Sequence, residues 1–270
     1  MRQHVQKLSL IAVSAISAIT LMTTAQAATV AVTVTVQNLA PANSISFAPL
    51  RLGFNKGTFD AFNLGQVAGA PIVSVAEGGG GADWFPAFAA ADPTATLGSV
   101  NGLLTPGSTL SATFNVDSVL NQFFTFAAMA VPSNDFFIGN DDPTEYRLFD
   151  AAGNLALTSI NQKASDIWDA GSEIFDPAAA AFVGTNSLRT PQNSVVSFNF
   201  AELAGFNGLT TGAGYVFNSA LTANSDVYRI SFAVAQPVPE PETYALMAAG
   251  LLAVGWVARK NKRVTATTGE

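Results

Sequence analysis

Seven residues near the start of the chain alternate strictly between valine and a small or polar residue, Val30-Ala31-Val32-Thr33-Val34-Thr35-Val36. Because successive side chains of a strand point to opposite faces, this pattern places four valines on one face. A helix would spread the same valines around its circumference. The segment is therefore predicted to be a half-buried β-strand that packs through its valine face against a second layer.

The same alternation recurs in two later segments, residues 109–116 and 226–234. Further strands are predicted where Phe, Val or other apolar residues gather, at residues 122–131, 194–200, 71–76 and 145–149. Helices are predicted to be few and short, at residues 58–64, 85–91, 162–168 and 177–182. Many strands joined by Gly, Pro, Asn and Asp, with few helices, favour an all-β fold, an antiparallel β-sandwich.

The N-terminal residues have the form of a secretory signal peptide. Arg2 and Lys7 precede a stretch of apolar and small residues at 8–22, and Ala25-Gln26-Ala27 has the small-x-small form of a cleavage site. Residues 1–27 are therefore predicted to be removed by signal peptidase. The mature chain is expected to begin at Ala28, outside the inner membrane.

The C-terminal residues combine three elements in a fixed order. Pro239-Glu240-Pro241 lies in a Pro-rich stalk, residues 236–242, and an uncharged apolar run follows at 243–258. The next segment, 259–270, opens with four basic residues: Arg259, Lys260, Lys262 and Arg263. The run is shorter than the ~20 residues that span a bilayer, but snorkelling basic ends and a locally thinner bilayer compensate. A transmembrane helix is predicted at 243–258, with its basic tail on the cytoplasmic side.

This order resembles the PEP-CTERM tail, a family of bacterial sorting signals. The resemblance implies that a membrane enzyme, exosortase, recognises the tripeptide, helix and basic cluster in a Gram-negative bacterium, often one that makes exopolysaccharide. It also implies a membrane-anchored precursor that is later sorted to the cell surface or the extracellular matrix. The alternative interpretation is an ordinary C-terminal anchor that happens to follow a Pro-rich stalk.

The residues between these two ends, 28–235, suffice for one domain with a substantial core. They carry 16 acidic and six basic residues, a net charge of −10. Such a surface repels polyanions, so no nucleic-acid partner is expected, whereas divalent cations are attracted wherever carboxylates converge. The chain has no cysteine, although an exported protein is free to form disulfides.

The same composition narrows the chemistry that the mature chain can perform. His4, the single histidine, lies in the predicted signal peptide, and cysteine is absent. A Ser-His-Asp triad, a Cys-His pair and any histidine-bearing zinc or non-haem iron site are therefore excluded. A hydrolase that acts on polysaccharide through paired carboxylates stays open as an alternative to a non-catalytic binding module. A structural matrix protein without a specific ligand is the third interpretation.

Two predicted elements end next to a carboxylate. Asp135 follows the predicted strand at 122–131, and Asp169 follows the predicted helix at 162–168. Asp117, Asp141 and Asp142 add further carboxylates that can join them. Ca²⁺ prefers such hard oxygen ligands together with loop carbonyls. Asp also closes turns routinely, so the spacing alone leaves both interpretations open.

Five short motifs occur in a defined order along the mature domain. They are Asn38-Leu39-Ala40-Pro41, Phe62-Asn63-Leu64-Gly65-Gln66, Ala76-Glu77-Gly78, Val131-Pro132-Ser133-Asn134-Asp135 and Trp168-Asp169-Ala170-Gly171-Ser172-Glu173. This order resembles the spondin N-terminal domain, a C2-like antiparallel β-sandwich, over nearly the whole mature domain. Animal extracellular-matrix members bind calcium through one Asp of each of the last two motifs. The resemblance thus implies Asp135 and Asp169 as calcium ligands.

The same resemblance implies a further acidic ligand on the strand before the Pro-Ser motif. The nearest equivalent is Asn115, with Asp117 two residues on, and Glu173 ends the last motif where the family has Asp. With one negative charge fewer, calcium is expected to bind weakly, at ~10⁻⁴ to 10⁻³ M. The sequence as a whole predicts an exported, non-catalytic binding or adhesion module of the polysaccharide matrix. Its expected partners are an extracellular glycan or a surface protein.

Overall fold

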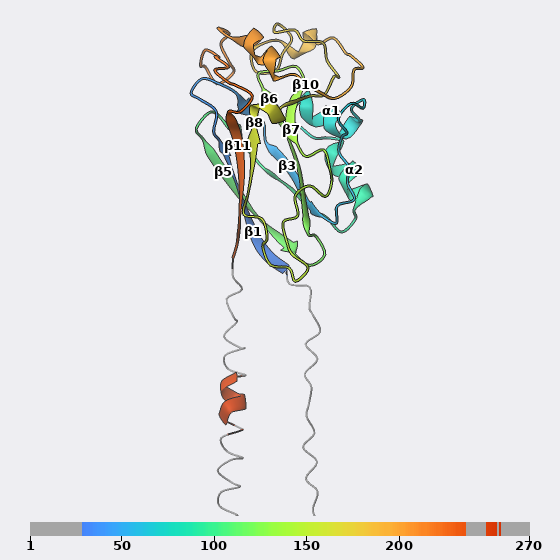
Figure 1. The fold of residues 1–270 in the computed structure, drawn as a ribbon, viewed down its shortest axis with the longest axis vertical. Coiled ribbons are helices and arrows are strands. Elements are labelled where there is room, and N and C mark those ends of the chain that lie inside the picture. The colour runs from blue at the N-terminus through green and yellow to red at the C-terminus, as the bar shows by residue number, and fades with distance from the viewer. Residues whose placement is uncertain (1–28, 236–246, 253, 255–270) are drawn as a thin grey trace, which may run out of the picture.

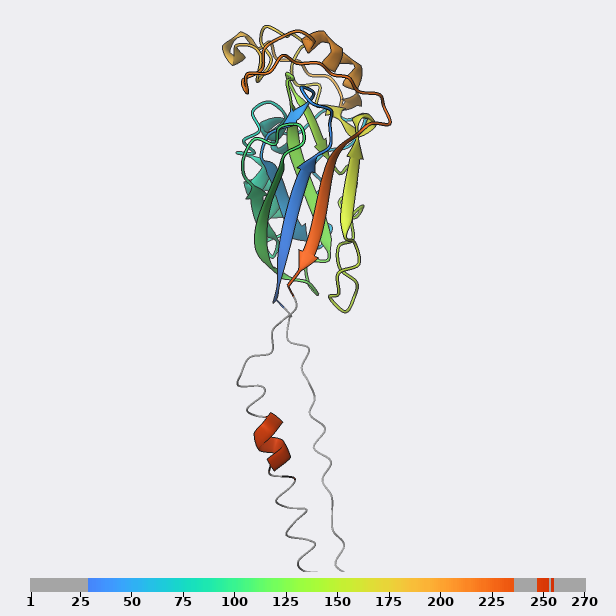
Figure 2. The ribbon, with the colours of Figure 1, turned by 90° about the vertical axis from the view of Figure 1, so that its left-hand side faces the viewer.

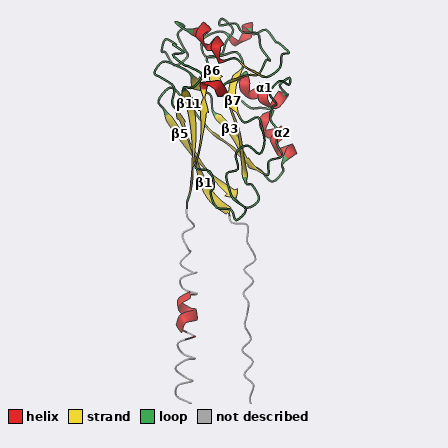
Figure 3. Cartoon of the chain, in the orientation of Figure 1, coloured by secondary structure: helices red, strands yellow, loops and turns green. Residues whose placement is uncertain are grey.

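Two antiparallel sheets dominate the protein, a computed structural model that describes residues 29–235, 247–252 and 254 (Figures 1 and 3). The four-stranded sheet has the order β5-β1-β11-β8, with bounds Thr109–Asp117, Thr29–Asn38, Asp226–Val234 and Ser159–Lys163. The strand predicted from alternating valines is β1, and it pairs with both β5 and β11. The three strands predicted from period-2 alternation are thus confirmed and lie next to one another.

The second sheet has seven strands. Along it lie β10, β9, β7, β6, β3 and β4, with bounds Ser197–Phe198, Trp168–Asp169, Phe136–Gly139, Phe123–Val131, Leu50–Asn55 and Thr96–Val100. The two-residue strand β2, Ser46–Phe47, pairs with β6 beside this row. The strand predicted at 122–131 is β6, whereas the one predicted at 194–200 contains only the two residues of β10.

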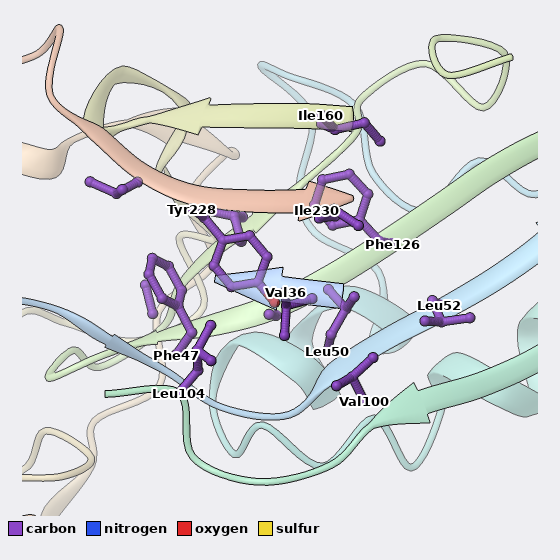
Figure 4. Packing of buried hydrophobic residues seen from close by; sticks show 14 of the residues in the cluster. Val36, Phe47, Leu50, Leu52, Val100, Leu104, Phe126, Ile160, Tyr228 and Ile230 are labelled. Carbon is purple, nitrogen blue, oxygen red and sulfur yellow. The ribbon is translucent and has the colours of Figure 1, made fainter. Parts of the chain in front are cut away.

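The main core lies between the two sheets (Figure 4). Val32, Val34 and Val36 of β1 are at most 1% exposed and share this core with Phe124 and Phe126 of β6. Full burial of one such side chain stabilises the fold by about 1.5–3 kcal/mol. The valine face of β1 is thus the inner face of the sandwich, as the alternation predicts.

Two short helices, α1 (Ala70–Ala76) and α2 (Trp84–Ala91), cover the outer face of the seven-stranded sheet (Figure 1). Trp84 and Phe88 of α2 form a second apolar cluster with Ala127 of β6. Gly53 of β3 makes this close approach possible, because a Cβ atom there would lie 2.6 Å from Phe88 Cε2. As a result β6 is buried on both faces, which explains its continuous apolar sequence.

The strand predicted at 71–76 is wrong, since these residues belong to helix α1. Pro71 occupies the first turn, where its fixed φ suits a helix and its missing N–H costs nothing. Ile72, Val75 and Ala76 then share one buried helical face. This i, i+3, i+4 spacing is the signal that distinguishes the segment from a strand.

The other predicted short elements have mixed outcomes. The helix predicted at 85–91 is confirmed as α2, and the one at 162–168 is reduced to the 3₁₀ turn η1, Ala164–Asp166. Residues 58–64 and 177–182 form no helix. Residues 145–149 make only isolated bridges, Phe123 to Arg147 and Phe149 to Leu155, in place of the predicted strand.

The two ends of the sandwich differ in kind (Figures 1 and 2). At one end, the tether pole, β1 begins and β11 ends, and the Ala235 N–H donates to the Ala31 carbonyl at 3.0 Å. At the opposite end, the cap pole, lies the segment between β9 and β11, residues 170–225, here called the cap segment. It contains mostly loops and the short 3₁₀ helices η2 (Asn186–Leu188) and η3 (Phe200–Phe206).

Several predictions for the chain ends fall outside the described residues: the signal peptide at 1–27, the stalk at 236–242 and the basic tail at 259–270. Of the predicted membrane helix at 243–258, residues 247–252 are described as helical, and Met247, Leu251 and Leu252 are more than half exposed. Within the described part of the chain, every helix falls short of the length and hydropathy that crossing a membrane requires.

Candidate acidic site at the cap pole

Asp135 and Asp169 are brought together by the pairing of β7 with β9. In this register Phe136 lies opposite Asp169, and the Ala170 N–H donates to the Asp135 carbonyl at 3.2 Å. The two carboxylates are 34 positions apart in the sequence but adjacent in the fold. The structure thus brings together the two residues that the last two spondin-like motifs single out.

Asp135 is held by a dense set of donors. Its Oδ2 accepts from the Ser172 N–H at 2.7 Å, the Ser172 hydroxyl at 3.1 Å and the Glu173 N–H at 2.9 Å, and the residue is only 2% exposed. Burial, followed by repulsion from Asp169, raises the pKa of Asp135 to about 6 despite these bonds. The pKa of Asp169 is also raised, by burial and by the charge of Glu202. The pair therefore carries negative charge that its surroundings only partly compensate.

A sharp turn follows this pair and orders the motif. Asp169 Oδ1 accepts from the Gly171 N–H at 2.7 Å, and Gly171 has φ +67°, in the left-handed region that favours glycine. A Cβ atom at this position would lie 2.8 Å from the carbonyl carbon of Ser194. The Asp-Ala-Gly sequence thus turns the chain so that the Ser172 and Glu173 N–H groups point back at Asp135.

Glu173 belongs to a neighbouring ion-pair group rather than to the Asp pair. Its Oε1 lies 3.1 Å from Arg189 Nη1, which also lies 3.9 Å from Glu77 Oε2. The Glu173 residue is 5% exposed, and its Oε2 has no hydrogen-bond partner among the described residues. Burial raises the pKa of Glu173 to about 7, although the charge of Arg189 acts in the opposite direction. Arg189 thus pairs with both Glu173 and Glu77 and places one positive charge between two carboxyl groups.

Asn115 and Asp117 do not join this site. Both lie near the end of β5, where Asp117 pairs with Thr29 at the tether pole. Asp117 Oδ1 accepts from the Val119 and Leu120 N–H groups at 3.1 and 2.9 Å, so it closes the turn after the strand. The nine residues of β6 separate this turn from Asp135, a distance of about 30 Å at ~3.3 Å per residue. The ligand set that combined Asn115 or Asp117 with Asp135 is therefore wrong.

Asp141 and Asp142 follow β7 and lie away from the Asp135 pair. Asp141 Oδ1 accepts from the Leu64 N–H, and Asp142 Oδ1 accepts from Thr144, so both order the loop at 140–146. Among the residues that the structure describes, no group of three or more Asp, Glu or His side chains has the arrangement of a metal site. Only Asp135 and Asp169, of the predicted ligands, are left as an adjacent pair.

Glu202 is the residue of this site that the sequence did not reveal. It lies in η3, and its charge raises the pKa of Asp169. Glu202 is 33 positions from Asp169 in the sequence, and the intervening cap segment has no periodicity that would place it. The only local signal is Asn199, whose side chain donates to Glu202 Oε1 within the same turn.

The residues that follow the sandwich carry a recognisable motif. Residues 237–260 match the model of the PEP-CTERM protein-sorting motif. The chain carries a PEP-CTERM sorting motif. The match includes Pro239, Glu240 and Pro241 and the first basic residues, Arg259 and Lys260, while Lys262 and Arg263 lie just beyond it. The PEP-CTERM motif indicates an exported, surface-sorted protein that exosortase processes.

No curated protein matches the chain. The PEP-CTERM match covers the tail alone, so the spondin likeness of the sandwich stays a prediction from the five motifs.

Proposed function

We propose that the protein is a non-catalytic binding module of the extracellular polysaccharide matrix, exported and held by its tail so that its cap pole faces outward. One observation carries this proposal: the domain ends at the tether pole, two residues before the sorting motif begins, while the cap segment lies at the opposite pole (Figure 1). A tail that leaves from one pole presents the other to the surroundings, first at the inner membrane and then at the cell surface of a Gram-negative bacterium.

The surface of the cap segment supports a role in binding. Among the described residues of the sandwich, 29–235, twelve large apolar side chains are exposed. Seven of them belong to the cap segment: Ile174, Phe175, Leu188, Val195, Phe198, Leu209 and Val216. Exposed apolar groups that gather in one region mark interaction surfaces more often than isolated ones do. A glycan or a surface protein is the partner class that this surface and the sorting motif together favour.

We further propose that calcium stabilises the cap pole through Asp135 and Asp169. These residues fit the ion in chemistry, because they supply hard oxygen ligands and carry adjacent charges that a divalent cation would neutralise. Two carboxylates are fewer than a tight calcium site has, so loop carbonyls and water would complete the coordination. The expected affinity is weak, at ~10⁻⁴ to 10⁻³ M. Glu202 adds negative charge to the pair, whereas Asn115 and Asp117 take no part.

A polysaccharide hydrolase needs a pair of carboxylates that the substrate can reach. Asp135 and Asp169 are an adjacent pair at the cap pole, but Asp135 is almost fully buried and its Oδ2 is occupied by three donors. At the Asp135–Asp169 pair the hydrolase alternative therefore has less support than the binding module. A structural matrix protein differs from both in having no specific ligand, and the following experiment distinguishes it.

The protein, purified from producing cells, is tested for retention on exopolysaccharide prepared from the same cells. The Leu188→Ser, Val195→Ser variant removes two exposed apolar side chains of the cap segment. The Val119→Ser, Leu120→Ser variant makes the same kind of change in the turn at the tether pole and serves as the matched control. We expect the cap variant to lose retention and the control to keep it. Equal retention of both variants, or no retention of the unmodified protein, would contradict the proposal.

A further inference from the structure

A separate cavity of about 360 Å³ lies where the edge strand β8 of the four-stranded sheet faces β7 and β9 of the other sheet. Four carboxylates line it: Asp141, Asp142, Glu145 and Asp166. None of Asp135, Asp169 and Glu173 belongs to its lining. The cavity is therefore distinct from the acidic site at the cap pole, and the binding function proposed above makes no use of it.

The charge of this cavity is uncompensated by its own walls. No Lys or Arg is among the lining residues, and the nearest basic residues on the two neighbouring strands are Lys163 and Arg229. Lys163 is exposed, and Arg229 Nε donates at 2.8 Å to Oδ1 of Asn161, a residue that itself lines the cavity. Burial, and then the charges of the other three carboxylates, raise the pKa of Glu145. The other three carboxylates are thus close enough to Glu145 for their charges to act on it.

The wall that carries these groups is fixed by hydrogen bonds within the protein. Asn140 accepts from the Phe126 N–H and donates to the Asp142 carbonyl, both at 3.0 Å, so the loop is tied to β6. On the opposite side, Asp166 Oδ2 accepts from the Lys163 N–H at 2.8 Å. A ligand would therefore meet a preformed set of acceptors, which lowers the cost of ordering them on binding.

The side chain of Gln162 indicates that the cavity holds a ligand and is more than an acidic surface. The residue is 3% exposed and lines the cavity, and its Nε2 donates to Tyr146 Oη at 3.1 Å. Tyr146 in turn donates to Glu145. These bonds leave Gln162 Oε1 buried without a partner among the described residues. A buried acceptor without a donor is costly, so this atom favours a ligand that brings a donor into the cavity.

The other walls restrict what that donor is. Tyr146 and Trp168 line the cavity, and aromatic faces attract cations. Its volume lies near the lower end of the range for small-molecule pockets, roughly 300–1,000 Å³, and far exceeds the size of one metal ion. The four carboxylates also lack the grouping of a metal site within the described residues. The complementary ligand is thus an organic cation with several N–H donors.

We propose that this cavity binds a protonated primary amine carried by a molecule of about monosaccharide size. The ammonium group would face Glu145 and Asp166 and donate to Gln162 Oε1. Amino sugars with a free amino group and aliphatic polyamines share this chemistry. A neutral or N-acetylated sugar lacks the positive charge and the three N–H donors of an ammonium group.

The full-length protein is titrated with glucosamine, N-acetylglucosamine, glucose or putrescine at constant ionic strength. Calorimetry measures the heat of each titration. We expect glucosamine or putrescine to bind at least about tenfold more tightly than the two neutral sugars. Tighter binding of glucosamine would identify an amino-sugar site, and tighter binding of putrescine a polyamine site. Equal affinity for charged and neutral ligands, or no binding of either amine, would overturn the proposal.

Two variants with the same charge change per residue locate the site. Glu145→Gln removes one carboxylate from the cavity, and we expect it to weaken amine binding by about tenfold. Asp83→Asn removes one exposed carboxylate that makes no capping hydrogen bond at the start of α2, and it should leave the affinity unchanged. Equal weakening by both variants would indicate only attraction to the acidic surface and would overturn the assignment.

A second measurement is independent of any variant. In the unmodified protein, bound glucosamine or putrescine should slow backbone hydrogen exchange in residues 139–146 and 161–168. Protection confined to other segments, the cap segment included, would place the amine elsewhere and refute the cavity as its site. Failure of this test leaves the cap-pole proposal untouched, because the two sites share no lining residue.

Discussion

Replacement of Asp135 by Asn is predicted to change how the stability of the sandwich depends on pH. In the folded protein the pKa of Asp135 is raised from 3.8 to about 6 by burial and by Asp169. An unfolded chain loses this proton near 3.8, so folding stability falls as the pH rises from there through about 6. The contribution is thus fully present below 3.8 and lost above the folded pKa.

The magnitude follows from the two pKa values. Each pKa unit corresponds to ~1.4 kcal/mol, so ionisation of Asp135 lowers the free energy of unfolding by about 3 kcal/mol at neutral pH. The amide that the Asp135→Asn variant carries cannot ionise and still offers an oxygen to the Ser172 and Glu173 N–H groups. We subtract the free energy of unfolding of the unmodified protein from that of the variant. This difference should rise by about 3 kcal/mol between about pH 4 and pH 7, because only the unmodified protein loses stability.

The assay is equilibrium urea unfolding, followed by tryptophan fluorescence in the presence of a calcium chelator. Asp83→Asn is the control, because it removes an exposed carboxylate at the start of α2. Its stability difference from the unmodified protein should stay nearly constant over the same pH range. A flat difference for Asp135→Asn, or one that falls as the pH rises, would refute the electrostatic description of the Asp135–Asp169 pair.

Three further predictions concern the metal, the packing and the sorting signal. Millimolar calcium should raise the melting temperature of the unmodified protein and of an Asn115→Ala, Asp117→Asn variant, while Asp135→Ala, Asp169→Ala should abolish the rise; thermal scans that show the reverse pattern would contradict the ligand assignment. Gly53→Ala should destabilise the domain by about 1–3 kcal/mol in urea unfolding because its Cβ meets Phe88, whereas Gly78→Ala, where no atom lies within 4 Å, should be nearly neutral. Replacement of Pro239, Glu240 and Pro241 by Ala should leave unprocessed protein in the inner membrane, as fractionation and immunoblotting would detect; normal maturation would argue against exosortase recognition.

The sequence predicts the fold best where one face of a strand meets the core and the other meets solvent. The alternating valines of β1 have this environment, and so do β5 and β11 beside it. Prediction misses β3, because this strand is mostly buried on both faces and its residues, Leu50–Asn55, do not alternate. Helix α1 escapes prediction for a related reason, since a short run of Val and Ile suits either structure until Pro71 is placed in a first turn.

The candidate site could be predicted only as far as motifs fix local turns. Asp169 closes the Asp-Ala-Gly turn itself, and Ser133 bonds to the neighbouring Ala130 and Phe136 and so orders the segment that carries Asp135. Glu202 and the loop with Asp141 and Asp142 depend on how distant segments pack, which no local pattern records. Asn115 and Asp117 failed as ligands because the direction of β5 takes them to the opposite pole.

The central claim is that this sandwich works outside the inner membrane, with its PEP-CTERM tail at the tether pole. Intact-mass spectrometry of the protein recovered from the surface and matrix of producing cells tests it most directly. We predict a chain that begins at Ala28 and has been cut near Pro239-Glu240-Pro241. Recovery of the complete polypeptide, both ends uncut, from the cytosol of those cells would contradict the claim.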